Sequence, residues 1–166
     1  MVSVNDFLAL YMNYFNDICR QNYSSMKTEL EKILSVSGKT GIFKLITGGR
    51  ATIIVESLVD GKRLPVHPTQ KVSALSDITM FTYEEDVPLR EIFMKAKAAF
   101  DGGQAPDPKS ESNVLRDAMK KILPDYDQER VYDSDIRKLL MWYNILQSKD
   151  MLDFAEPVQE EGSEEA

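Results

Sequence analysis

Few residues of this chain combine the types and spacing that catalysis requires. His67 is the only histidine and Cys19 the only cysteine, so histidine-paired triads, multi-histidine metal sites and intrachain disulfides are excluded. His67 precedes Pro68 in an expected surface loop, and Cys19 has no residue near it in sequence to act as a general base. We therefore expect a protein that is not an enzyme, with no catalytic residues, no cofactor and no metal ligands.

Two other clusters contain ligand-binding residue types but favour structural roles. Residues 37–41 (SGKTG) resemble a phosphate-binding loop in composition. That loop needs G-x-x-x-x-G-K-[ST] between a strand and a helix, whereas this cluster leads into an expected strand. Residues 84–86 (EED) offer the oxygen ligands that a divalent cation prefers. Because they precede Val87-Pro88 and an expected helix, we interpret them as an acidic first helical turn.

Basic residues are the remaining candidates, and they point to binding. The net charge is −7, yet residues 26–80 carry eight bases and five acids, a local balance of +3. An acidic total weakens the case for a nucleic-acid partner, and the local balance leaves that case open. We predict a partner-binding face made by basic residues of the expected strands and of a later helix: Lys44, Arg50, Lys62, Arg63, Arg137 and Lys138.

Residues 41–66 must position the strand part of this face. Gly48-Gly49 and Asp60-Gly61 lie between runs rich in β-branched residues, and both dipeptides readily supply the positive φ angles of a tight hairpin. The pattern predicts a three-stranded antiparallel meander whose short last strand, with Pro65 near its end, is an edge or barrel-closing strand. After a loop we expect a fourth strand over 78–83. Closure into a small SH3-like barrel would remove the exposed edges.

Three helices are expected after the strands. Apolar side chains recur at three- and four-residue spacing in residues 88–100, 111–123 and about 133–148. The compact connector 124–127 indicates a helix-turn-helix-like unit, whose third helix would present Arg137 and Lys138 to a groove. The neighbouring acids at 133 and 135 favour a plain helical core instead, because a duplex reader normally has a denser basic face.

The two ends of the chain differ from its middle. Residues 1–25 have the apolar spacing of an amphipathic helix, but Met26 begins MKTELEKIL, which is typical of a natural start. We interpret residues 1–25 as an N-terminal extension with three alternatives: a segment upstream of the native start or poorly ordered, a helix packed on its own domain, or a docking helix for a partner. A short capped helix is expected over 27–34, with Thr28 as N-cap. Residues 153–166 are acidic and poor in apolar residues, and we expect them to be disordered.

Four stretches carry a family resemblance: MKTELEKILSVSGKTGIFKLI, VESLVDGKRLPV, VSALSDITMFTYEEDVPLREIF and LPDYDQERVYDSDIRKLLMWYNIL. From Met26 to about Phe154 the chain resembles a family of small Bacteroidetes proteins built from domains of unknown function. The resemblance implies an N-terminal β module and a C-terminal helical module, and members that start near Met26. It implies no activity, cofactor or site residue.

Together these observations predict an α+β protein. We expect a small SH3-like β-barrel domain over 26–83, a three-helix domain over 84–152 and an acidic tail over 153–166. The expected function is that of a cytoplasmic, non-enzymatic binding or adaptor protein that contacts a protein partner through its basic β face. The alternatives are a nucleic-acid-associated regulator using the same face and, second, an enzyme of unknown class. No apolar run approaches the roughly 20 residues of a membrane span, so no membrane partner is expected, and the oligomeric state stays open.

Overall fold

The central strands form the predicted antiparallel meander, but only the second turn dipeptide supplies a positive φ; Gly48 and Gly49 do not. The computed structural model describes residues 28–49, 52–67 and 69–154, and in it β2 (Phe43–Gly48), β3 (Ile53–Ser57) and β4 (Arg63–Val66) pair in succession. At the second turn Gly61 has a φ of +70° and donates its backbone N–H to the Ser57 carbonyl at 2.8 Å. β4 is an edge strand, as Pro65 predicts.

The strand β1 (Ile33–Val36) corrects a wrong prediction. The sequence predicted a helix over 27–34, but only the 3₁₀ turn η1 (Leu30–Lys32) precedes β1. β1 pairs on one side with β2 and on the other with β5 (Val72–Ala74), in a stretch predicted to be a loop. Because this interior position buries Ile33 and Val36 to 1% exposure each, tertiary pairing outweighs the local helix signals.

The five-stranded sheet is curved and open. Its strand order is β4-β3-β2-β1-β5, and within the described residues no pairing joins the edge strands β4 and β5. Five strand residues nevertheless form a buried cluster of their own: Leu34, Val36, Phe43, Val55 and Val66. All the partly buried side chains packed against this cluster also come from β1 to β5, so the sheet covers its own apolar face by bending. A closed SH3-like barrel is not confirmed.

The predicted fourth strand lies outside this sheet. Residues 79–80 form β6 (Thr79–Met80), which pairs with β7 (Val87–Pro88) in a separate two-stranded sheet after the 3₁₀ turn η2 (Leu75–Asp77). The acidic residues 84–86 make the turn of this small hairpin, so their assignment to a first helical turn was wrong. The hydroxyl oxygen of Thr82 accepts the backbone N–H groups of Glu84 and Glu85, at 3.2 and 3.1 Å, and thereby closes the turn.

The three helices confirm the apolar periodicity. They are α2 (Leu89–Ala99), α3 (Ser112–Ile122) and α4 (Asp133–Ser148). Each buries the stripe that its spacing predicts, and α4 also buries Trp142, the only tryptophan of the chain. In the core, Tyr143 donates its hydroxyl to the Gly103 carbonyl at 3.0 Å, and burial raises the pKa of its phenol.

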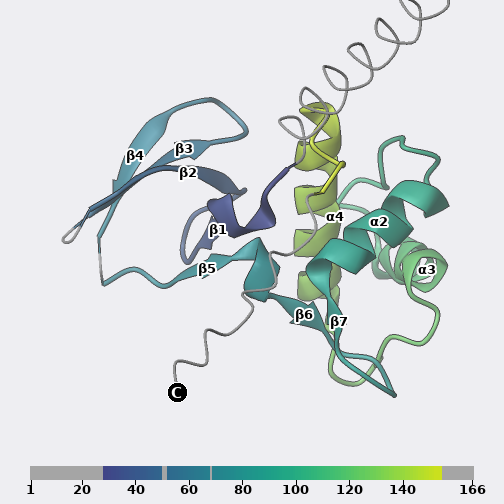
Figure 1. Ribbon diagram of the computed structural model, residues 1–166. Coiled ribbons are helices and arrows are strands. Elements are labelled where there is room, and N and C mark those ends of the chain that lie inside the picture. Colours follow the sequence, from purple (N-terminus) through teal and green to yellow (C-terminus); the bar gives the residue numbers. More distant parts are fainter. Residues whose placement is uncertain (1–27, 50–51, 68, 155–166) are drawn as a thin grey trace, which may run out of the picture.

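The helices and the near ends of the strands share one core. The larger buried cluster combines residues of α2, α3 and α4 with Leu30, Ile33, Ile42 and Leu75 from the strand region. In Figure 1 the curved sheet lies on the left and the helices on the right, with the β6–β7 hairpin below. The fold is therefore α+β, an antiparallel sheet beside three helices. None of the described helices is long and apolar enough to cross a membrane. The predictions for residues 1–25 and for most of 153–166 lie outside the described residues.

Candidate functional site

The predicted basic face of the sheet is partly neutralised by its own acids. Lys44 and Arg63 flank Glu56 across β2, β3 and β4, and the Nε of Arg63 lies 3.0 Å from a carboxylate oxygen of Glu56. The structure thus brings two of the predicted residues onto one row. It also places an acid between them, which lowers the potential that an anionic partner would meet.

The next predicted cation is also engaged locally. The ammonium of Lys62 lies 3.2 Å from the carboxylate of Asp60. The pKa of the Asp60 carboxyl is lowered from its ordinary value. The largest cause is its hydrogen bond with Ser57, and the next is its hydrogen bond with Lys62. Arg50 lies outside the described residues. Among the predicted cations of the strands that the structure describes, Lys44 is therefore the one without an ion pair.

The two predicted cations of α4 have different surroundings. Arg137 is exposed on the helix surface. Lys138, also exposed, lies at the edge of a cavity of about 280 Å³ between the β6–β7 hairpin and α4. We call this cavity the α4 pocket. Its lining is mostly apolar, with three charged side chains: Ile78, Thr79, Met80, Phe81, Leu89, Arg130, Val131, Asp135, Lys138, Leu139 and Trp142.

Arg130 reaches the pocket through a turn built by Asp127. One carboxylate oxygen of Asp127 accepts the backbone N–H groups of Glu129 and Arg130, at 2.9 and 3.2 Å. The Asp127 N–H in turn donates to the Phe81 carbonyl at 3.0 Å, so this loop is held against the strand region. As a result the guanidinium of Arg130 lies 3.6 Å from the centroid of the Phe81 ring, a cation–π contact.

The first half of α4 forms the other wall. The backbone N–H of Tyr132 donates to a carboxylate oxygen of Asp135 at 3.1 Å and so fixes the start of the helix. From Asp135, the positions i+3, i+4 and i+7 lie on the same helix face, which places Lys138, Leu139 and Trp142 along the pocket. Trp142 is 8% exposed and Lys138 is exposed, so an apolar floor meets a cationic rim.

This arrangement places two cations beside an apolar surface. Within the described residues neither Arg130 nor Lys138 forms an ion pair, while Asp135 is occupied in capping α4. An apolar cavity with a few converging polar groups is the usual form of a ligand site. Two cations beside such a floor would attract an anionic group attached to an apolar one. In the described part of the chain no three histidine, cysteine or carboxylate side chains cluster as a metal site.

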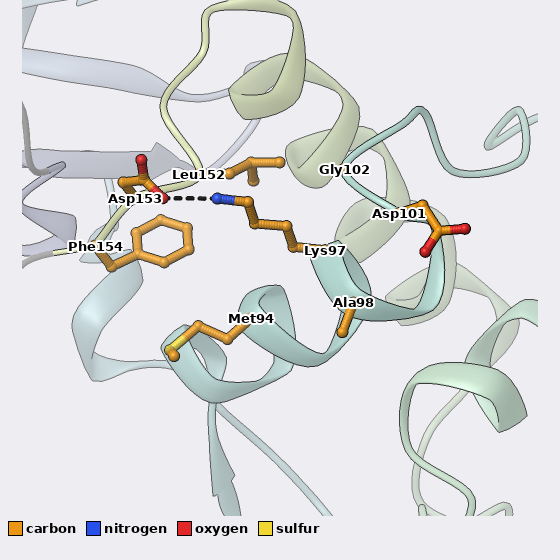
Figure 2. Close-up of a pocket in the computed structure, with 8 residues that line it drawn as sticks. All are labelled: Met94, Lys97, Ala98, Asp101, Gly102, Leu152, Asp153 and Phe154. Carbon is orange, nitrogen blue, oxygen red and sulfur yellow. Dashed lines mark hydrogen bonds and ion pairs between the residues drawn. The ribbon is translucent and has the colours of Figure 1, made fainter.

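A second, more open cavity of about 530 Å³ lies beside α2. Figure 2 shows the side chains of Lys97 and Asp153 turned toward each other, while the carboxylate of Asp101 points away from them. The Lys97 ammonium lies 2.6 Å from a carboxylate oxygen of Asp153. Phe154, also on this wall, stacks on Phe93 with 5.9 Å between the ring centroids. This cavity is the junction where residues 152–154 pack on α2. Its one cation is paired within the chain, which makes this cavity the weaker candidate for an anionic ligand.

The sequence predicted Lys138 and missed Arg130, Phe81 and Trp142. One signal was present in the sequence: the i, i+3, i+4, i+7 pattern that starts at Asp135 ends on the only tryptophan. Arg130 carried no such signal, because its partner Phe81 lies 49 positions earlier in the chain.

The fold and the pocket together define a small α+β protein with a cavity between a β-hairpin and a helix. Two family models match, both described as domains of unknown function: DUF5606 over residues 30–75 and DUF6852 over residues 78–146. A solution NMR structure of a protein from Bacteroides vulgatus, a structural-genomics target, is 39% identical. The match covers 74% of this chain and 88% of that one, with a TM-score of 0.62. The comparison with curated proteins gives no match.

These findings place the chain in a family. It belongs to the same family of Bacteroidetes proteins as the Bacteroides vulgatus protein, and both domains of unknown function match within it. The resemblance read from the four sequence stretches is thereby confirmed.

Proposed function

We propose that this protein is a cytoplasmic, non-enzymatic binding or adaptor protein that recognises an acidic peptide segment carrying one bulky apolar side chain. One observation carries the proposal: Arg130 and Lys138 border an apolar cavity floored by Trp142. A cavity of about 280 Å³ suits a single anchoring side chain. Charge-assisted contacts from the two cations to neighbouring carboxylates would then supply orientation and affinity.

A labelled synthetic peptide tests this proposal. The probe has one phenylalanine flanked by glutamates, and fluorescence anisotropy measures its binding to the full chain. Replacing both cations, Arg130→Gln and Lys138→Gln, should weaken binding by about tenfold or more. The matched control Lys120→Gln with Lys121→Gln removes two exposed cations of α3 that do not line the pocket. This control should bind like the wild type. Equal affinity in all three proteins contradicts the proposal.

The competing proposal is a nucleic-acid-associated regulator. This proposal includes an SH3-like β module and a helix-turn-helix-like helical module. The curved five-stranded sheet supports the first likeness, and the connector between α3 and α4 supports the second. The ion pairs of Lys62 and Arg63 weaken it. A labelled DNA duplex distinguishes the two functions. Tight binding that falls steeply with salt, and that is lost in the Lys44→Gln, Arg63→Gln variant, would favour the regulator.

A further inference from the structure

The chain contains a segment with the chemistry that the α4 pocket fits. Residues 155–166 contain five glutamates and no basic residue, and Val158 lies between Glu156 and Glu160. Carboxylates around one branched apolar side chain would match the cationic rim and the apolar floor. We propose that residues 155–166 occupy the α4 pocket in cis and compete there with the partner peptide. This inference rests on the proposed function and adds its regulation.

The described chain ends against α2, the helix whose first residue, Leu89, lines the α4 pocket. The side chain of Phe154 is buried to 7% exposure, and its ring stacks on Phe93 of α2. The backbone N–H of Thr28 donates to the Asp153 carbonyl at 2.6 Å, which fixes this end of the segment. Leu89 lines the α4 pocket and precedes Phe93 by one helical turn, about 6 Å along the helix.

The length of the segment is sufficient to reach the site. Twelve residues follow Phe154, and an extended chain of that length spans roughly 40 Å. This is several times the one-turn separation between Phe93 and the pocket wall. The segment therefore has enough chain to reach the pocket.

Tethering supports the cis contact even when each charge interaction is weak. A tethered segment experiences an effective concentration on the order of millimolar, so a few carboxylate contacts to Arg130 and Lys138 are enough to hold it. Because both cations lie at the rim, salt should screen these contacts. A partner peptide would then bind more weakly to the wild-type chain than to one whose segment has lost its charge.

The experiment keeps the chain at full length and removes only charge. The variant E156Q/E160Q/E161Q/E164Q/E165Q neutralises the segment, and the control E31Q/E91Q/E111Q neutralises three exposed glutamates elsewhere. The same phenylalanine–glutamate probe reports affinity. The emission of Trp142, the only tryptophan and part of the pocket floor, reports occupancy without any probe.

The inference predicts that the segment variant binds the probe about tenfold more tightly than the wild type at low salt. The gain should shrink at high salt and be absent when Arg130→Gln and Lys138→Gln are added. Trp142 emission should differ between wild type and segment variant, independently of protein concentration. The control should behave like the wild type. A difference in emission that grows with protein concentration would mean that the segment binds a second copy, which contradicts the cis arrangement.

The two proposals fail in different ways. If the probe binds wild type and segment variant with equal affinity, and Trp142 emission is the same in both, the cis inference is overturned while the proposed function stands. If the probe binds neither protein, the proposed function fails. In that case Trp142 emission alone decides the inference: a salt-sensitive difference between the two proteins supports it, and identical spectra overturn it.

Discussion

Asp127 shows how one carboxylate positions the candidate site. It accepts two backbone N–H groups, including that of Arg130, and is 9% exposed. Hydrogen bonds to a charged group are stronger than neutral ones, and leaving their donors unpaired is costly. Asp127 does not itself line the α4 pocket. Its effect on binding would come only through the guanidinium that its turn places over Phe81.

Replacing Asp127 should separate this positioning role from a general loss of stability. Asp127→Ala should lower the free energy of unfolding by about 1–3 kcal/mol and also weaken binding of the phenylalanine–glutamate probe. Asp127→Asn retains a side-chain oxygen acceptor and should restore most of both quantities. The control is Asp125→Ala, which changes an exposed neighbour. Its free energy of unfolding and its probe affinity should match those of the wild type. Probe affinity unchanged in Asp127→Ala, measured below its unfolding transition, would mean that the turn does not position Arg130.

Among the elements, the β3–β4 turn depends on one glycine. Gly61 has a φ of +70°, in the left-handed region that favours glycine, and a Cβ there would meet no atom within 4 Å. Gly61→Ala should therefore cost about 1 kcal/mol through backbone strain alone. Gly48, which also has open space around it and no positive φ, is the matched control. Urea denaturation measures the stability of both variants. Equal unfolding midpoints for Gly61→Ala and Gly48→Ala would refute the strain argument.

The elements also show how far sequence patterns extend. The meander and the three helices were predictable because their signals are local: turn dipeptides, and apolar residues at helical spacing. β1 was missed because the local signal in its sequence, a set of capping residues, favours a helix. Its structure is determined instead by long-range pairing with β2 and β5. In the hairpin β6–β7, the sequence predicted a single strand followed by the start of a helix, because the pairing of its two strands is not visible in local patterns. Two-residue strands leave almost no pattern.

For the whole molecule, the central feature is the core shared by sheet and helices. Ile33 and Ile42 are buried together with α2, α3 and α4, although the matched family models divide the chain between residues 75 and 78. The candidate site depends on the same long-range packing, since Phe81 and Arg130 meet only when residues 81–83 lie against 125–127. This is why the sequence predicted one of its two cations and not the pocket.

A shared core predicts cooperative unfolding. Trp142 emission follows the helical part of the core, and hydrogen exchange at β2 and β3 amides follows the sheet. Both should report the same unfolding midpoint in urea, as expected for a two-state protein of this size. Ile42→Ala should shift both probes equally, by about 2–5 kcal/mol. Two separate transitions, or a shift in the sheet signal alone, would mean that the two family domains unfold independently.

The most direct measurement of the central claim locates the bound peptide on the full chain. A nitroxide label attached beside the phenylalanine of the acidic probe broadens the NMR signals of amides near it. We predict broadening at Phe81, Arg130 and the first half of α4, with β2, β3 and β4 unaffected. Broadening confined to the face of Lys44 and Arg63 would contradict the account and return recognition to the sheet.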